Sequence, residues 1–248
     1  MITMKPAVIV SEVIKIFPTE SQEQKYNVAL NKVSFSINEG SLTVIGGANG
    51  SGKSVLMNII AGLMDPSDGK IIVSSRPGLI FQDASTQILG DTPREDVSVG
   101  PKNMGCKKKE IAAIVEDCLK SVSLLQKADY PAEFLSGGEK RRLAVASILA
   151  MHKDIIIFDE PFANLDYNGV LEVNSLITSL HKQGKTILLL THELEKCLGL
   201  ADHFLILHKG KLVFDGLPQD ALFLPLENWG IRNPCTAYNK LSDLIWSK

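Results

Sequence analysis

Apolar and polar residues alternate along two stretches near the N-terminus, residues 7–14 and residues 33–37. Alternation with a period of two is typical of strands that have one buried face and one exposed face. We therefore predict two half-exposed strands and expect them to pair antiparallel. The polar residues 18–25 between them predict a loop.

Runs of consecutive apolar residues predict buried strands further along the chain. These runs are residues 41–45, 155–158, 187–190 and 204–207, with shorter strand-like runs at 70–73 and 79–81. From residue 154 onward the runs alternate with helical stretches, which predicts a parallel sheet covered on both faces. Residues 209–211 then predict a hairpin turn into a last strand at residues 212–214.

Helical periodicity marks three further stretches. They run from about Lys53 to Gly62, from Lys107 to Ser123, and onward from a start after Gly138. In the second stretch the apolar positions fall on one face, and we expect the Lys107–Lys109 run at its start to face solvent. Residues 83–105 are polar and interrupted by Pro and Gly, so we predict turns and loops there.

Composition narrows the class of protein. The chain has 248 residues, 45% of them hydrophobic, so one domain that buries roughly 70–75% of its unfolded surface is expected. A formal net charge of −2 argues against a nucleic-acid partner. The four cysteines are widely spaced, which predicts reduced thiols in a cytosolic protein and no metal knuckle. Neither a signal peptide nor a membrane-spanning helix is predicted.

A glycine-rich segment follows the buried strand at residues 41–45. It fits the pattern GxxxxGK(S/T) and consists of Gly47, Ala48, Asn49, Gly50, Ser51, Gly52, Lys53 and Ser54. Glycines let successive backbone N–H groups curl around a phosphate, and the N-terminus of the following helix adds a favourable dipole. Lys53 would reach the β- and γ-phosphates, and the Ser54 hydroxyl would bind Mg²⁺. The segment therefore predicts a nucleotide site.

Two carboxylates, Asp159 and Glu160, follow the apolar run at residues 155–158. The carboxyl ends of parallel strands form the ligand crevice, so Asp159 is expected near the Mg²⁺ of the phosphate-binding segment. Glu160 would point toward an attacking water. The structural alternative, two surface acids that cap a strand, is disfavoured by the neighbouring phosphate-binding segment.

The segment Leu135–Glu139 has the sequence LSGGE, and Ser136 and Glu139 have the spacing of a capping box. Because this segment precedes the strand with the two carboxylates by about 20 residues, it closely resembles the signature motif of ABC-type ATPases. Other residues match that family's Q-loop, D-loop, switch histidine and adenine-stacking aromatic. They are, in that order, Gln82, Asn164–Leu165–Asp166, His192 and Phe17. The resemblance covers nearly the whole chain.

A narrower match concerns residues 81–89 and 95–105, which look like the Q-loop and following segment of energy-coupling-factor (ECF) transporter ATPases. That group energises the uptake of vitamins and of cobalt or nickel. Three positions depart from the usual pattern, with Val55 in place of Thr, Ala48 in place of Pro and Phe17 in place of Tyr. None of these changes removes a catalytic group, so we expect ATP hydrolysis.

The resemblance implies the ABC ATPase fold as a single domain over residues 1–248. A P-loop, RecA-like α/β core would span about 40–82 and 150–215, beside an antiparallel β lobe built largely from the N-terminus. A helical signature lobe would span 85–149, and a short C-terminal tail would span 216–248.

The resemblance also implies a head-to-tail dimer, with a second copy or a paralogous ATPase, around ATP and Mg²⁺. The implied nucleotide contacts are Phe17, Gly47, Ala48, Asn49, Gly50, Ser51, Gly52, Lys53, Ser54, Val55, Ser136, Gly137, Gly138 and Asp166. The implied metal contacts are Ser54, Gln82 and Asp159. Glu160 would orient or deprotonate water, His192 would hold the γ-phosphate, and Gln82 would link the metal to the partner surface. An integral membrane transporter subunit and a substrate-binding membrane component would place the chain at the cytoplasmic face of the cell membrane.

Two other classes remain open. One is a soluble ABC-type enzyme, such as an iron–sulfur assembly or DNA-repair ATPase, and the other is a regulator that clamps on nucleotide without hydrolysing it. A repair ATPase would need a long coiled coil between Lys53 and Leu135, but that stretch carries no heptads. Glu160 and His192 argue against the regulator. The resemblance implies that the ATPase itself does not contact the transported substrate.

Overall fold

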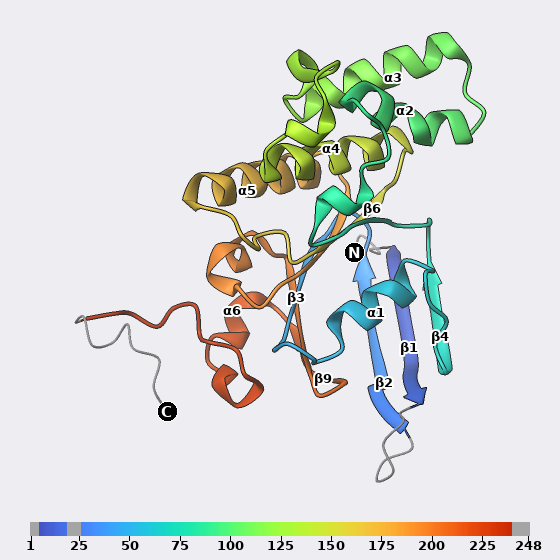
Figure 1. The fold of residues 1–248 in the computed structure, drawn as a ribbon. Helices are drawn as coiled ribbons and strands as arrows, with labels where there is room; N and C mark the ends of the chain where they lie inside the picture. The colour runs from blue at the N-terminus through green and yellow to red at the C-terminus, as the bar shows by residue number, and fades with distance from the viewer. Residues whose placement is uncertain (1–4, 19–25, 240–248) are drawn as a thin grey trace.

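The computed structural model describes residues 5–18 and 26–239 of the chain. Figure 1 shows two β-sheets and a group of helices at one end of the larger sheet. Helix α1 (Lys53–Ile60) lies between the two sheets, because its apolar side chains belong to the same buried cluster as side chains of both.

The smaller sheet is antiparallel, as predicted for its first two strands. It contains β1 (Pro6–Pro18), β2 (Tyr26–Asn38) and β4 (Asp68–Val73), in the order β2-β1-β4. Its inward side is apolar, so the alternation in the sequence fits one face of this sheet against α1. Of the loop predicted at residues 18–25, residues 19–25 lie outside the described part of the chain.

The larger sheet has the order β5-β6-β7-β3-β8-β9. Its strands are β3 (Leu42–Gly46), β5 (Gly78–Ile80), β6 (Ile155–Asp159), β7 (Thr186–Leu190), β8 (His203–His208) and β9 (Lys211–Gly216). In this order, β5, β6, β7, β3 and β8 each pair in parallel with the next strand, and β9 pairs antiparallel with β8. This confirms both the predicted parallel sheet and the predicted hairpin at residues 209–211.

Alternate residues of each central strand enter two separate cores. In β6, Ile155 and Ile157 pack toward α1 and the smaller sheet, whereas Ile156 and Phe158 pack toward the helices on the opposite face. A strand buried on both faces has no polar positions to alternate, which explains its continuous apolar run.

The helices cover the second face and extend beyond it (Figure 1). The α-helices after α1 are α2 (Pro93–Asn103), α3 (Lys108–Ser121), α4 (Gly137–Ala150), α5 (Tyr167–Lys182) and α6 (Pro218–Ala221). The 3-10 helices are η1 (Ala84–Gln87), η2 (Leu125–Lys127), η3 (Ala132–Phe134), η4 (Leu194–Lys196), η5 (Leu198–Leu200) and η6 (Leu226–Trp229). The residues after β9 contribute Ala221, Leu226 and Ile231 to the core, and residues 240–248 lie outside the described part.

Helix α2 corrects the expectation of turns and loops throughout residues 83–105. It begins with Pro93 at its first turn, and the Thr92 hydroxyl accepts a hydrogen bond from the backbone N–H of Glu95 at 3.3 Å. In the sequence, Gly100 and Pro101 argued against a helix. In the structure, Gly100 packs closely against Met151, because a Cβ there would lie 2.4 Å from the Met151 side chain. A larger residue at this position would require Met151 to move, so Gly100 permits the close packing seen here.

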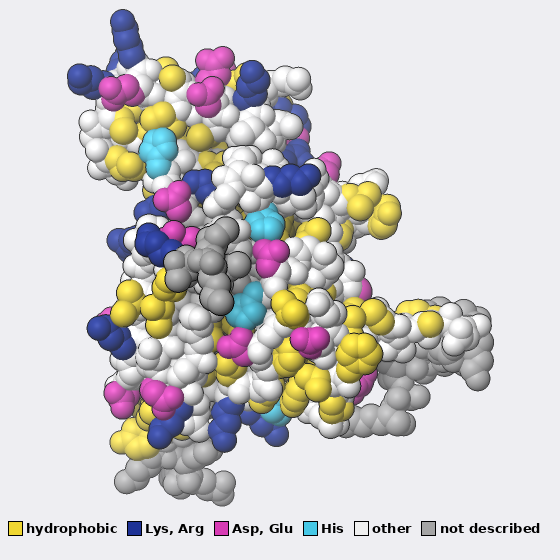
Figure 2. Space-filling view, turned by 180° about the vertical axis from the view of Figure 1, so that it is seen from behind, with side chains coloured by type: hydrophobic (Ala, Val, Ile, Leu, Met, Phe, Trp, Pro, Cys, Tyr) yellow, Lys and Arg dark blue, Asp and Glu magenta, His cyan; other side chains and the backbone are white. Residues whose placement is uncertain are grey.

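Helix α3 matches its prediction, with Val115 and Leu119 buried. Lys107, Lys108 and Lys109 are exposed as expected, and Figure 2 shows Lys and Arg side chains at the outer end of the helical region. No helix in the described ranges combines the length and hydrophobicity needed to span a bilayer.

Candidate nucleotide-binding site

The phosphate-binding segment connects the end of β3 to the start of α1, as the sequence predicts. Gly47 has φ +151°, and a Cβ there would lie 2.4 Å from the carbonyl oxygen of Leu207. Gly52 has φ +103°, and a Cβ there would lie 2.6 Å from the carbonyl oxygen of Ala29. Glycine is therefore required at both positions to keep the backbone of this loop close to its neighbours.

Lys53 opens α1 and is 6% exposed. Its Nζ atom donates to the carbonyl oxygens of Gly47 at 2.7 Å and Ala48 at 3.2 Å. It also lies 3.8 Å from Oε1 of Glu160. Burial lowers the pKa of the Lys53 ammonium, while the carboxylates of Glu160 and Asp159 oppose this shift. The loop therefore folds around a cation that is held close to a carboxylate.

Asp159 and Glu160 lie at the carboxyl end of β6. Burial and the charge of Glu160 raise the pKa of Asp159, while Lys53 and a hydrogen bond with Ser54 oppose the shift. Glu160 has φ +46°, which is uncommon for a residue other than glycine, and its backbone N–H donates to the carbonyl oxygen of Leu190 at 2.9 Å. The two side chains therefore leave the strand in different directions.

His192 comes to the same place from the neighbouring strand. Its Nδ1 atom lies 3.0 Å from Oε2 of Glu160, and its backbone N–H donates to the same oxygen at 3.4 Å. This arrangement follows from the pairing of β6 with β7, because His192 follows the end of β7 closely.

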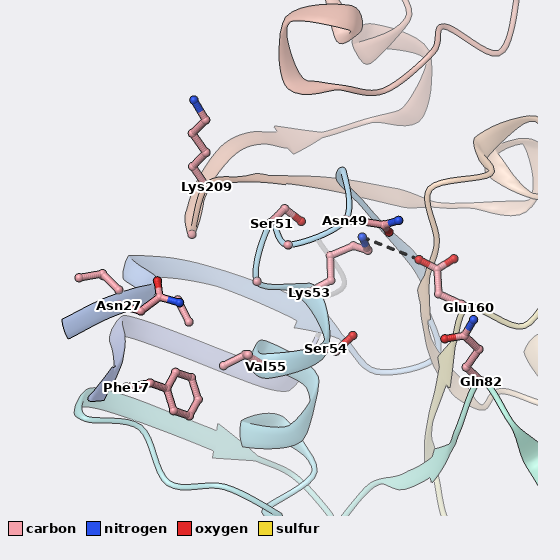
Figure 3. Close-up of a pocket in the computed structure, with 15 residues that line it drawn as sticks. Phe17, Asn27, Asn49, Ser51, Lys53, Ser54, Val55, Gln82, Glu160 and Lys209 are labelled. Carbon is pink, nitrogen blue, oxygen red and sulfur yellow. Dashed lines mark ion pairs between the residues drawn. The ribbon is translucent and has the colours of Figure 1, made fainter. Parts of the chain in front are cut away.

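Lys53 and Glu160 line a cavity of about 560 Å³ (Figure 3), whereas Asp159 and His192 are not among its lining residues. Of the sequence-predicted contacts, it is lined by Phe17, Asn49, Gly50, Ser51, Gly52, Lys53, Ser54, Val55, Gln82 and Glu160. Phe17 lies at the opposite end of the cavity from Glu160, with Lys53 and Ser54 between them (Figure 3). The aromatic ring of Phe17 at one end suits a base, and the Lys53 ammonium further along the cavity suits a polyphosphate.

Sequence reasoning missed part of the wall of this cavity. Asn27, Val28 and Ala29 of β2 line it, as do Lys209 and Gly210 of the β8–β9 hairpin. The backbone N–H of Gly210 donates to the carbonyl oxygen of Ser51 at 3.0 Å. The hairpin turn was predicted, but no pattern along the chain indicated that it would contact the phosphate-binding segment.

The signature residues lie elsewhere. Ser136 is the N-cap of α4, where its hydroxyl accepts from the backbone N–H of Glu139 at 3.3 Å, and this confirms the predicted capping box. Gly137 lines a second cavity of about 650 Å³, together with Gln82 and Asp159. Ser136, Gly138 and Asp166 do not line the cavity that contains Lys53. Asp166 caps α5 and accepts a hydrogen bond from the backbone N–H of Gly169 at 2.8 Å.

The residues near the first cavity fit a magnesium ion. Oδ1 of Asp159 is buried and has no hydrogen-bond partner within the described residues, so a carboxylate oxygen is available for a ligand. Carboxylate, hydroxyl and amide oxygens of Asp159, Ser54 and Gln82 are the donors that Mg²⁺ prefers. The described part of the chain contains no cluster of three His, Cys, Asp or Glu side chains suited to a metal. A single carboxylate is nevertheless enough for Mg²⁺ where substrate phosphates supply other ligands.

The sequence of this chain is similar to the sequences of known proteins. The sequence pattern of the ABC transporter family matches residues 30–163. The energy-coupling factor transporter ATP-binding protein EcfA of Carboxydothermus hydrogenoformans is 39% identical over 203 residues, which cover 77% of this chain and 75% of that protein.

Two solved structures share the fold. The cbiO1 protein of Clostridium perfringens, described as part of the ABC transporter complex cbiONQ, has a TM-score of 0.78 and 30% identity, covering 87% of this chain and 90% of that one. The ATP-binding cassette MJ0796, solved as a dimer in a post-hydrolysis state with ADP and Pi, has a TM-score of 0.74 and 26% identity. That match covers 85% of this chain and 98% of the other.

Proposed function

This chain belongs to the ABC transporter family, and we propose that it is the ATP-binding and ATP-hydrolysing subunit of an importer of the energy-coupling-factor type. The observation that carries the proposal is that Glu160 lies close to both Lys53 and His192, in a cavity that Lys53 and Glu160 line. The family's ATPase domain implies ATP as the nucleotide. The relatives of this type supply the finer assignment to importers.

The proposed chemistry is divided among three side chains. Lys53, at the N-terminus of α1, stabilises the charge on the β- and γ-phosphates. Glu160 accepts a proton from, or orients, the water that attacks the γ-phosphorus. His192 holds the γ-phosphate and, through its contact with Glu160, fixes the direction of that carboxylate.

Mg²⁺ would be held by Ser54, Asp159 and Gln82, where it would neutralise charge that develops on the phosphate oxygens. The raised pKa of Asp159 reflects burial and the neighbouring charge of Glu160, and both disfavour the ionised carboxylate. A nearby cation reverses that preference. Gln82 lines both cavities, so it lies between the cavity that contains Lys53 and the second cavity, which Asp159 also lines.

We infer that hydrolysis requires a head-to-tail dimer. The signature residues Ser136 and Gly138 do not reach the Lys53 cavity of their own chain. They begin α4, a helix whose positive N-terminal end can stabilise a phosphate of the partner's nucleotide. The dimeric state of the similar cassette MJ0796 supports this arrangement.

A third cavity, of about 490 Å³, supports a membrane partner. Ile88, Asp91, Pro131 and Glu133 are among the residues that line it. Beside these residues in the sequence, Leu89 is 76% exposed, and Phe134 is 65% exposed. Exposed apolar side chains around a hollow are typical of a docking site. We propose that an integral membrane subunit docks here and that a membrane component binds the substrate, a vitamin or a transition-metal ion. The chain would then work at the cytoplasmic face of the membrane.

Co-purification tests this function. The tagged chain is expressed in its native cell, and detergent-solubilised membranes are compared with the cytosolic fraction for proteins retained on the tag. Retention of a multi-span membrane protein, with ATP hydrolysis by the purified complex, is expected. ATP hydrolysis with all retained partners in the cytosolic fraction would favour the soluble ABC-type enzyme. Nucleotide binding without hydrolysis would favour the regulator.

A further inference from the structure

Arg141 is a buried cation whose hydrogen bonds are incomplete. It lies in the first turns of α4 and is 5% exposed. Its Nη2 atom donates to the carbonyl oxygen of Gln82 at 3.3 Å. Its Nε and Nη1 atoms have no hydrogen-bond partner within the described residues. A buried guanidinium with unsatisfied donors costs stability, so its presence at this position calls for an explanation.

The acid nearest in sequence to Gln82, Asp83, compensates this burial only in part, because its charge opposes the lowering of the Arg141 pKa by burial. Oδ1 of Asp83 accepts from the backbone N–H of Ser85 at 3.0 Å and from the Ser85 hydroxyl. Asp83 therefore caps η1, and its attraction to Arg141 acts without a hydrogen bond to the guanidinium. The contact that Arg141 makes is with the backbone of Gln82.

That contact connects helix α4, which carries the signature segment, with the nucleotide cavity. Arg141 is four residues after Gly137, at the start of the helix that carries the signature segment. The side chain of Gln82 lies at the edge of the nucleotide cavity, beside Glu160 (Figure 3). Arg141 also lines the second cavity together with Gln82. A displacement of α4 would therefore act on Gln82 through Arg141.

Helix α4 also holds the other end of the segment formed by residues 82–90. The Ser147 hydroxyl donates to Oδ2 of Asp96 at 2.6 Å, and Oδ1 of Asp96 accepts from the backbone N–H groups of Leu89 at 2.7 Å and Gly90 at 3.2 Å. Residues 82–90 are thus fixed to one helix at both ends. The Asp96 connection holds Gly90, which lines the third cavity, and the Arg141 connection holds Gln82, which lines the nucleotide cavity.

We propose that Arg141 is a positioning residue that holds the backbone of Gln82, so that the Gln82 side chain keeps its place at the nucleotide cavity when α4 moves. This inference rests on the proposed role of Gln82 in hydrolysis. Arg141 itself does not line the cavity that contains Lys53. Its loss should therefore slow turnover through Gln82 and leave the affinity for ATP unchanged.

A double-mutant cycle on the full-length chain tests this route. Four proteins are compared: wild type, Arg141→Met, Gln82→Ala and the double variant. We expect each single variant to lower kcat by about 10- to 100-fold, with the Kd for ATP within about twofold of wild type. The double variant should be no slower than Gln82→Ala. Arg141→Lys, which keeps a donor and the charge, should recover much of the lost kcat.

Arg142→Met is the matched control, because Arg142 is the next residue on α4 and pairs with Glu172 of α5 instead. Its effect on kcat should multiply with that of Gln82→Ala. Thermal unfolding identifies a variant that does not fold, and Arg141→Gln then replaces Arg141→Met in the cycle. The Mg²⁺ concentration for half-maximal rate should rise in Arg141→Met as it does in Gln82→Ala, which a purely structural arginine would not cause.

The outcomes separate this inference from the proposed function. Multiplicative effects of Arg141→Met and Gln82→Ala would overturn the inference while leaving the ATPase assignment intact. A lack of hydrolysis by wild type in its assembled complex would overturn the proposed function and the inference with it. A normal kcat in Arg141→Met would overturn the inference alone.

Discussion

Nδ1 of His192 lies 3.0 Å from Oε2 of Glu160, although the two residues follow different strands. The contact depends on the left-handed backbone of Glu160, whose φ of +46° is a strained conformation for a residue with a side chain. It also depends on the parallel pairing of β6 with β7, which ends both strands at one edge of the sheet. The strain directs the carboxylate of Glu160 toward His192 and Lys53 instead of along the strand.

Glu160→Gln should keep ATP binding and lower turnover by about 100-fold or more, because an amide has the same shape but cannot accept the proton. Steady-state hydrolysis and equilibrium nucleotide binding measure the two effects separately. Glu195→Gln makes the same charge change at an exposed position near His192 and should hydrolyse ATP at the wild-type rate. Near-normal turnover in Glu160→Gln would remove Glu160 from the mechanism.

Lys53→Ala should instead weaken nucleotide binding, because it removes charge from the phosphate site.

The dimer prediction uses the same variant to trap ATP. Glu160→Gln should be largely monomeric without nucleotide and should double its mass on addition of Mg-ATP, since bound ATP joins the two surfaces. Light scattering measures the mass, and a separate binding assay confirms that the nucleotide is bound.

Gly137→Asp in the Glu160→Gln background provides a control for that experiment. A Cβ at Gly137 meets no atom within 4 Å, so the monomer can accommodate the substitution. An aspartate there would repel the phosphates of a partner's nucleotide. We expect the double variant to bind ATP and remain monomeric. A dimer of unchanged stability would show that the signature segment does not face the second nucleotide.

Sequence patterns were most informative where one physical requirement fixed several neighbouring residues. Strand β6 had to be apolar on both faces, and the phosphate-binding loop needed glycine at Gly47 and Gly52. These requirements leave a local signature, so the strands, the α1 start and the paired carboxylates could be predicted.

Features that depend on distant contacts could not be predicted in this way. Gly100 predicted a loop because its packing against Met151 cannot be read from the sequence. In the structure it lies in helix α2, where Val97 is fully buried. Lys209 contributes to the cavity wall because the β8–β9 hairpin packs beside the phosphate-binding segment. The local sequence of the hairpin does not indicate where it packs. The burial of Arg141 likewise depends on how α4 packs against residues 82–90.

The docking proposal predicts a loss of binding without a loss of chemistry. Leu89 is 76% exposed, so Leu89→Glu adds a charge to the surface with little effect on folding. We expect the variant to lose co-purification with the membrane partner, while ATP hydrolysis by the isolated subunit stays near wild type. Leu63→Glu is the matched control, because Leu63 is 56% exposed and follows α1 instead. If Leu89→Glu retains the partner at wild-type yield, Leu89 is not part of the docking surface.

The ion pair at the start of α4 predicts a pH-dependent stability. Nζ of Lys127 donates to Oε1 of Glu139 at 2.6 Å, and this contact lowers the pKa of Glu139 below its usual value. A carboxyl group whose pKa is lower in the folded state stabilises the fold at pH values above its unfolded pKa. That contribution is lost as the pH falls through the folded pKa. Glu139→Gln can keep the hydrogen bond to the backbone N–H of Ser136 but removes the charge.

We therefore expect Glu139→Gln to reduce the free energy of unfolding by about 0.5 kcal/mol at pH 7, since the pair is partly exposed to solvent. Urea titrations should show this difference at pH 7 and its disappearance at an acidic pH below the folded pKa of Glu139. Lys127→Met should give a similar loss at pH 7, because it removes the other member of the pair. Glu133→Gln, at an exposed position just before α4, should leave the stability unchanged. A difference for Glu139→Gln that persisted at acidic pH would mean that the charge of Glu139 is not what stabilises the start of α4.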